Sequence, residues 1–172
     1  TRAFGDGHAA AWAHACLPEY AAGSVAMLAL GTGLGAGFVR DGRIHAGPRG
    51  EYPRVNDMFG PSVADLDLPP ATLSDDPESG SIPGSLEHLL GGLNLGTNPS
   101  EPQREAARRA LRTAVRAVRE LYFPDVTVIG GSVGLADWLA DEVAELGLVR
   151  SPFGTDAGLH GAAALAIHPG WR

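Results

Sequence analysis

The sequence predicts an α/β fold: a mixed sheet that contains a glycine-rich β-hairpin and has helices on its faces. Three observations lead to this fold. An apolar run at residues 25–30 continues into a cluster of glycines, the run at 125–129 is almost wholly apolar, and residues 100–123 carry an apolar stripe with helical spacing. A chain of 172 residues is long enough to bury a core as one domain or one large lobe.

Composition narrows the classes of function. The net charge of −7 argues against a general nucleic-acid binder and against a membrane-surface binder. The single cysteine, Cys16, excludes an internal disulfide framework and offers no thiolate cluster for zinc. A single cysteine fits a reducing compartment, so we expect a cytoplasmic protein. No apolar run has the length of a membrane span and no signal-peptide pattern opens the chain. Because the chain starts at Thr1, we expect a fragment, a processed chain or a renumbered one.

The first predicted element is a helix over residues 9–16, which is rich in alanine and is ended by Pro18. Asp6 lies just ahead of this helix, where a carboxylate commonly initiates helices. His8 and His14 are six residues apart and do not match a metal-binding pair on one helix face, so both are interpreted as ordinary histidines.

The glycine-rich hairpin, residues 28–42, is the most distinctive segment. A strand ending at Leu30 enters Gly31, Thr32 and Gly33, and Asp41-Gly42 is a strong hairpin signal. Glycines after a strand bring backbone N–H groups close to an anion, and Thr32 adds a hydroxyl donor. A phosphate cradle and a hairpin without a ligand both remain open at this point. A dinucleotide-binding fingerprint is disfavoured because a strand follows the glycines, where that fingerprint needs a helix.

The middle of the chain predicts a long irregular excursion followed by two helices. Residues 47–84 contain seven prolines and little periodicity, and we expect partial mobility around residues 70–82. Residues 84–91 predict a short helix with its leucines directed inward. A longer helix begins at Ser100, which forms a capping box with Gln103, and extends to about residue 123. Its arginines indicate a solvated face, and its apolar stripe comprises Ala107, Leu111, Ala114, Val115, Val118 and Leu121.

The last third predicts a buried strand over residues 125–129 that ends in Gly130-Gly131 and is followed by a helix over 135–146. This order places bare backbone at the carboxyl end of a strand, where α/β proteins bind ligands, although an ordinary strand-to-helix turn has the same pattern. Residues 148–149 predict a short strand and residues 158–167 a closing helix, in which Gly161 allows close packing.

Three separated segments together resemble the carboxyl-terminal part of the ROK family (repressors, open reading frames and sugar kinases) of the actin–hexokinase ATPase superfamily. Residues 28–42 resemble the family's second phosphate-binding segment, residues 128–133 its adenosine segment, and residues 158–166 its closing helix. Their order and spacing agree with the family. The resemblance implies a single ribonuclease-H-like, or actin-like ATPase, lobe.

The resemblance also implies roles for individual residues, with ATP as the phosphate donor, Mg²⁺ bound through the nucleotide and a sugar as the acceptor. Residues 5–11 are similar to the family stretch whose aspartate takes the proton of the attacking sugar hydroxyl. The implied assignments are Asp6 as the catalytic base, Gly31, Thr32 and Gly33 with the phosphates, Gly130 and Gly131 on the adenosine side, and Glu51 and Glu87 with the sugar.

The sequence also departs from the family pattern. Gly5 replaces an asparagine, Arg54 replaces a histidine, and Ser85 stands in place of a cysteine of the zinc loop, so no structural zinc is expected. The family's amino-terminal lobe, with its Asp-x-Gly-Gly-Thr segment, is missing from these residues. We therefore expect residues 1–172 to form the carboxyl-terminal lobe, with an irregular and mobile excursion at 52–82.

Two functions remain open. The first is a sugar-kinase lobe completed by an amino-terminal lobe or a second subunit; the second is a non-catalytic sugar-sensing or protein-interaction module, a degenerate pseudokinase of the same fold. A homodimer is an open alternative, and neither nucleic acid nor membrane is an expected partner. The identity of the sugar does not follow from the sequence.

Overall fold

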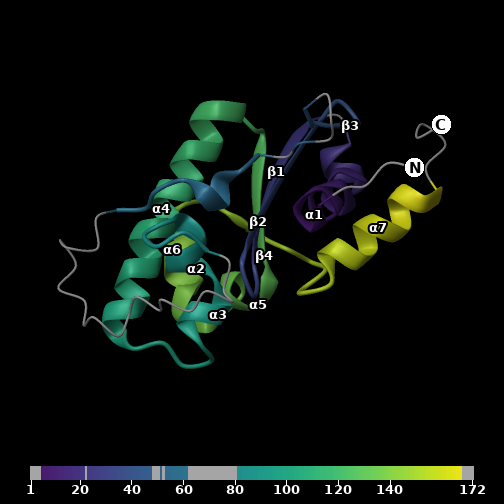
Figure 1. The fold of residues 1–172 in the computed structure, drawn as a ribbon. Helices are drawn as coiled ribbons and strands as arrows, with labels where there is room; N and C mark the ends of the chain where they lie inside the picture. The colour runs from purple at the N-terminus through teal and green to yellow at the C-terminus, as the bar shows by residue number, and fades with distance from the viewer. Residues whose placement is uncertain (1–4, 22, 48–50, 52, 62–80, 168–172) are drawn as a thin grey trace.

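The computed structural model describes residues 5–21, 23–47, 51, 53–61 and 81–167. Within these residues, one five-stranded mixed sheet separates two groups of helices (Figure 1). The predicted α/β fold with a mixed sheet and flanking helices is confirmed. The mobility expected around residues 70–82 falls mainly on residues 70–80, which lie outside the described residues.

The sheet has the strand order β3-β2-β1-β4-β5. β1 pairs antiparallel with β2 and parallel with β4, and β4 pairs parallel with β5. The carboxyl ends of β1 and β4 therefore meet at the same edge of the sheet, next to the β1–β2 turn. The strands are β1 Ser24–Leu30, β2 Leu34–Arg40, β3 Arg43–Ile44, β4 Val126–Gly130 and β5 Val149–Arg150.

Two tight turns build the hairpin system. Leu30 pairs with Leu34, so residues 31–33 form the β1–β2 turn. The predicted turn at Asp41-Gly42 joins β2 to β3, and both of its residues have positive φ (51° and 65°), as a primed hairpin turn requires. The return strand after this turn, β3, is only two residues long.

On one face of the sheet lie α2 (Leu86–Leu90), α3 (Gly92–Leu95), α4 (Glu101–Tyr122) and α6 (Ala140–Glu145). Alternate strand residues such as Leu28 point into this core because side chains alternate across a strand. The predicted capping box of α4 is present, and the Ser85 hydroxyl caps α2 by accepting from the His88 amide at 3.1 Å. One predicted member of the α4 stripe is wrong: Leu121 is 61% exposed, whereas its neighbour Tyr122 packs against the core.

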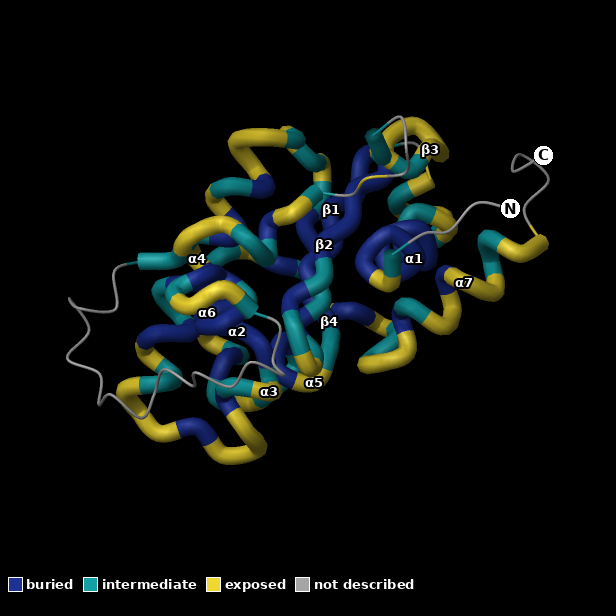
Figure 2. The backbone as a smooth tube through the Cα atoms, in the orientation of Figure 1, coloured by how far each residue is buried: buried dark blue, intermediate teal, exposed yellow. Residues whose placement is uncertain are grey.

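The opposite face carries α1 (Asp6–Ala15) and α7 (Ala157–Ile167), which pack against Val25, Met27 and Val128. Figure 2 shows that α1 is largely buried, whereas α7, which covers it, is exposed along much of its length. A Cβ at Gly161 would lie 1.6 Å from the carbonyl oxygen of Ala9, so the two helices touch backbone to backbone. The close packing predicted for Gly161 is confirmed.

The helix predicted over residues 135–146 is wrong in its bounds. α5 (Gly131–Gly134) starts directly after β4 because Gly131, with φ of 81°, turns the chain at once. Ala136 is extended (ψ 142°), and this ends α5 before a 3-10 turn at Asp137–Leu139 leads into α6. In the described part of the chain, 3-10 turns also lie at Pro18–Tyr20 and Val55–Asp57. Along the described residues, no helix is both long and apolar enough to cross a membrane.

Candidate functional site

A cavity of about 410 Å³, here called the Asp6 cavity, opens at the edge of the sheet where β1 and β4 end. The β1–β2 turn forms one wall, and the N-termini of α1 and α7 form another. Ligands of α/β proteins bind at such an edge, beyond the carboxyl ends of the strands. The N-terminus of α7 brings the positive end of its helix dipole to this wall and favours an anion there, whereas the Asp6 carboxylate already occupies the N-terminus of α1.

Asp6 is the first residue of α1 and is exposed toward this cavity. One carboxylate oxygen, Oδ1, accepts a hydrogen bond from the Gly7 amide at 2.7 Å. An ideal Cβ at Gly35 of β2 would lie 3.4 Å from the same oxygen, so the carboxylate rests against the bare backbone of β2. Asp6 thus begins a helix, as its position predicts, and also presents a carboxylate to a cavity.

The glycine turn is held by the segment that follows α2. The Gly31 amide donates to the Gly33 carbonyl at 3.0 Å and closes the turn. The carbonyls of Gly31 and Thr32 accept from the amides of Gly92 and Leu93 at 2.8 and 3.0 Å. These bonds fix the turn against α3, and the Thr32 side chain remains exposed at the cavity.

Glu87 of α2 reaches the other side of the same turn. Its Oε1 accepts from the Leu34 amide at 3.2 Å, and its Oε2 accepts from the side-chain nitrogen of Asn56 at 3.4 Å. A Cβ at Gly33 would lie 2.2 Å from Oε1, so the absence of a side chain at Gly33 makes room for the carboxylate. Glu87 therefore joins the glycine turn to the segment around Asn56.

A second cavity of about 500 Å³, here called the Trp138 cavity, lies on the other side of the turn. It shares Gly31 and Thr32 with the Asp6 cavity. Its walls include the aliphatic side chains of Leu93 and Val133 and the indole ring of Trp138. Trp138 also has the Arg104 guanidinium 5.9 Å from its ring centroid, a cation–π contact. The two cavities thus adjoin at two of the residues singled out in the sequence.

The structure brings six of the eight predicted site residues to the Asp6 cavity. The other two lie elsewhere. Gly130 lines neither cavity but is buried beneath them, where a Cβ would lie 2.7 Å from Met27 Cε. Glu51 lines neither cavity; it is exposed, and its carbonyl accepts from the Gly47 amide at 2.8 Å. The six residues in the wall are Asp6, Gly31, Thr32, Gly33, Glu87 and Gly131.

Other residues that line the Asp6 cavity were not predicted from the sequence. Asn56 falls in the excursion at 52–82, where no periodicity or motif singles it out. Thr155 precedes the closing helix, and its place next to a predicted helix N-terminus is a signal that could have identified it. Among the described residues, no group of three His, Cys, Asp or Glu side chains could hold a metal ion.

His8 lies two residues after Asp6 and is buried inside α1. Burial lowers the pKa of His8, while a hydrogen bond with the His45 backbone acts in the opposite direction. A neutral His8 adds no positive charge beside Asp6. The charged side chains that line the Asp6 cavity are the carboxylates of Asp6 and Glu87, so a ligand that offers hydrogen-bond donors suits this side of it.

No protein-family model matches the chain. Among curated relatives, the N-acetylmannosamine kinase of Escherichia coli O7:K1 is 28% identical in an alignment that covers 97% of this chain and 65% of that protein. The chain thus spans about 65% of the length of the curated relatives it matches.

Solved structures with the same fold include a ROK family glucokinase from Streptomyces griseus in complex with glucose and AMPPNP. Its TM-score is 0.67 at 16% identity, over 94% of this chain and 66% of that one. The ROK hexokinase from Thermus thermophilus has a TM-score of 0.68 at 24% identity, over 95% of this chain and 66% of that one. The resemblance to the ROK sugar kinases and the actin-like ATPase fold are confirmed.

Proposed function

We propose that this chain is the carboxyl-terminal lobe of a ROK-type sugar kinase that transfers the γ-phosphate of ATP to a sugar hydroxyl. The main support for this proposal is that the Asp6 cavity and the Trp138 cavity share Gly31 and Thr32 in their walls. A phosphoryl transfer needs the donor on one side of the transferred group and the acceptor on the other, held roughly in line. The glycine turn stands at the boundary between two such spaces.

The sugar would occupy the Asp6 cavity. The Asp6 carboxylate would accept the proton of the attacking hydroxyl, the role of a general base in phosphoryl transfer. Glu87, already in the wall, would accept hydrogen bonds from other hydroxyls. Glu51 remains a predicted sugar contact, and it would act there only if the segment that carries it approached the cavity on binding.

The nucleotide would lie across the turn, with its phosphates at Gly31, Thr32 and Gly33. The N-terminus of α7, a helix of eleven residues, adds favourable partial charge for phosphate. The adenosine would enter the Trp138 cavity, whose aromatic and aliphatic walls suit a purine ring. Gly131 and, from below, Gly130 would shape the adenosine side. Mg²⁺ bound to the nucleotide would supply positive charge to the phosphoryl oxygens.

The proposal includes a second lobe. Catalysis of phosphoryl transfer depends chiefly on positioning, and these cavities are open on one side of a sheet edge. An amino-terminal lobe, in the same protein or from a second subunit, would close the cleft over them. Residues 1–172 would then be one lobe, with 52–82 as an irregular excursion, and the whole kinase would act in the cytoplasm.

Binding and turnover test this function separately. Calorimetry of the chain with Mg–ATP and with glucose, mannose and N-acetylmannosamine should give binding of both a nucleotide and a sugar. Co-expression with a matching amino-terminal lobe should give ATP-dependent sugar phosphorylation, which Asp6→Asn lowers at least a hundredfold, as expected for loss of a general base. Asp41→Asn removes the same charge at an exposed turn and is the matched control. Unchanged turnover in Asp6→Asn would refute the assigned mechanism.

A non-catalytic sugar-binding module is the second candidate, and one observation favours it. Arg54, at the position of the family's histidine, has a side chain 65% exposed and pairs with Asp57, so it does not line the Asp6 cavity. Gly5 likewise brings no side chain beside Asp6. Sugar binding without nucleotide binding in the same calorimetric series would support the module.

A further inference from the structure

We propose that Asn56 is a specificity-determining residue of the Asp6 cavity, and that its side-chain carbonyl oxygen accepts a hydrogen bond from one hydroxyl of the bound sugar. This inference rests on the proposed function, since it takes a sugar as the occupant of the cavity. The starting observation is that Asn56 lines the cavity together with Asp6 and Glu87.

The segment that carries Asn56 is anchored on both sides. Val55 is 2% exposed and is part of the core. The Met58 carbonyl accepts from the Leu86 amide at 2.8 Å, and Phe59 forms a bridge with Ser85 at the start of α2. The 3-10 turn Val55–Asp57 is thereby fixed against the helix that carries Glu87. A side chain that selects between ligands must be held in this way.

The hydrogen bonds of Asn56 determine which way its amide faces. The side-chain nitrogen lies 2.9 Å from Asp57 Oδ1 and 3.4 Å from Glu87 Oε2. Ionised carboxylates only accept hydrogen bonds, so the NH₂ group must face them and donate both of its hydrogens. The carbonyl oxygen Oδ1 is then the atom that this side chain can offer to a molecule in the cavity.

The same network separates Asn56 from its neighbour Arg54. The Arg54 guanidinium pairs with Asp57 on the exposed side of the segment. Asp57 therefore has Arg54 on one side and the Asn56 amide on the other. Of these three residues, Asn56 is the one in the cavity wall, where it adds a neutral acceptor next to the charged acceptor Glu87.

Two acceptors side by side, Asn56 and Glu87, favour a ligand with more than one hydroxyl donor. A hydroxyl donates one hydrogen bond, and its replacement by hydrogen leaves a polar acceptor of the site without a partner. A sugar that lacks the hydroxyl facing Asn56 should therefore bind more weakly. The carbon that carries this hydroxyl is the position at which Asn56 discriminates.

Calorimetric titration of the 172-residue chain tests the inference. Glucose, mannose and N-acetylmannosamine are titrated first, and then the monodeoxy analogues of the sugar that binds most tightly. Asn56→Ala should weaken sugar binding about tenfold and leave Mg–ATP binding unchanged. One deoxy analogue should bind the wild-type chain about tenfold more weakly than the parent sugar does. The same analogue should bind Asn56→Ala less than about twofold more weakly than the parent sugar, because this variant already lacks the contact. Arg54→Ala, which alters the neighbouring exposed side chain, should leave sugar affinity within about twofold of wild type.

Equal sugar affinities for wild type and Asn56→Ala would overturn the inference and leave the proposed function intact. The inference would also be overturned if Asn56→Ala lost affinity by the same factor for every sugar analogue and for Mg–ATP, because that pattern indicates a structural role. If the wild-type chain bound none of the sugars, the proposed function would fail and the inference with it. Asn56→Ser replaces the alanine variant if the latter does not fold, with the same pattern expected across the deoxy series.

Discussion

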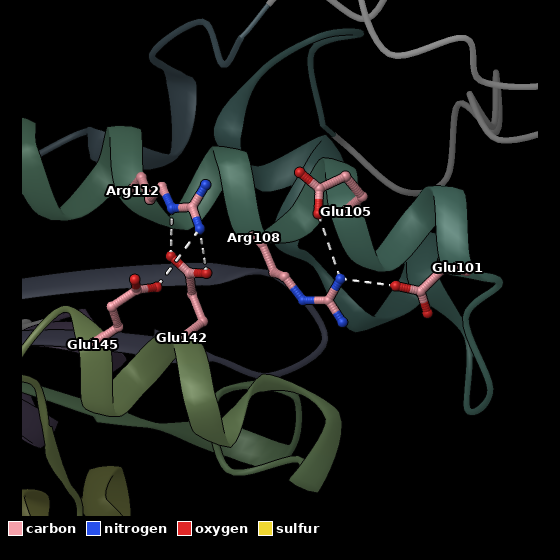
Figure 3. Close-up of polar contacts among 6 residues, drawn as sticks. All are labelled: Glu101, Glu105, Arg108, Arg112, Glu142 and Glu145. Carbon is pink, nitrogen blue, oxygen red and sulfur yellow. Dashed lines mark hydrogen bonds and ion pairs between the residues drawn. The ribbon is translucent and has the colours of Figure 1, made fainter.

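Arg112 and Glu142 form a two-bond ion pair that joins α4 to α6 (Figure 3). Arg112 Nε lies 2.6 Å from Glu142 Oε1, and Arg112 Nη2 lies 2.8 Å from Glu142 Oε2. The Glu142 side chain is only 4% exposed, whereas that of Arg112 is 51% exposed. Hydrogen bonding to Glu142 raises the pKa of Arg112. A buried carboxylate therefore depends on a half-exposed partner for its charge compensation.

Replacing Arg112 should destabilise the protein more than its exposure suggests. Arg112→Ala leaves the buried Glu142 carboxylate without its guanidinium, and we expect the free energy of unfolding to fall by about 2 kcal/mol. Arg116→Ala is the matched control, because its pair with Glu120 on the same helix is exposed on both sides (80% and 63%), and it should change stability by less than about 0.5 kcal/mol. Urea denaturation measures both. Equal effects for the two variants would contradict the importance of burial.

Because His14 is buried in its neutral form, the folded protein should lose stability at mildly acidic pH. His14 is fully buried; its Nδ1 donates to the Ala10 carbonyl at 2.7 Å, and its Nε2 accepts from the Ser151 hydroxyl at 3.0 Å. Burial lowers the pKa of His14 below its ordinary value of 6.5. The unfolded chain therefore takes up a proton below about pH 6.5 that the folded chain resists, and stability falls as the pH decreases.

The expected size of this effect is about 1 kcal/mol per pH unit below pH 6.5 for each buried neutral histidine. His8 contributes in the same direction, because burial also lowers its pKa. His14→Gln should reduce the slope of stability against pH between about 6.5 and 5, whatever its effect on absolute stability. His160→Gln, at an exposed position of α7, is the control and should keep the wild-type slope. A slope unchanged in His14→Gln would contradict this account.

The parts of the fold that local chemistry determines could be predicted from the sequence. The capping box at Ser100, the primed turn at Asp41-Gly42 and the buried strand before Gly130 each depend on residues within a few positions of one another. The resemblance of three segments to the ROK family predicted that the hairpin, the glycine pair and the closing helix contribute to one site. The structure brings six of the predicted residues to one cavity there.

What the sequence could not predict depends on tertiary contacts. The solvated face expected for the arginines of α4 holds for Arg116, but Arg112 compensates a buried carboxylate from another helix. The extended backbone at Ala136, which separates α5 from the 3-10 turn, is not described by helix propensity. Asn56 reaches the cavity only because the segment around it is anchored to α2, so no local pattern identified it.

Gly161 should be intolerant of a methyl group. Gly161→Ala places a Cβ 1.6 Å from the Ala9 carbonyl oxygen, so α7 must move away from α1. We expect a loss of at least about 2 kcal/mol in unfolding free energy. Gly158→Ala, in the same helix, has its nearest atom at 3.9 Å and should be neutral or slightly stabilising. Thermal unfolding followed by circular dichroism compares the two variants, and similar melting temperatures would contradict the close contact.

Gly33 and Gly31 have different reasons to lack a side chain: packing within the fold at Gly33, and space for the proposed phosphate at Gly31. A Cβ at Gly33 would collide with Glu87 Oε1 at 2.2 Å, whereas a Cβ at Gly31 meets no atom within 4 Å. Gly31→Ala should therefore fold with wild-type stability, while Gly33→Ala displaces the Glu87 carboxylate and loses about 1 kcal/mol. Because Gly31 lines both cavities, its added methyl would occupy the space proposed for phosphate. Calorimetry with Mg–ATP should then show at least about a tenfold loss of affinity in Gly31→Ala. A Gly31→Ala chain that binds Mg–ATP as tightly as wild type would show that the nucleotide lies elsewhere, because nothing in the fold itself requires a glycine at this position.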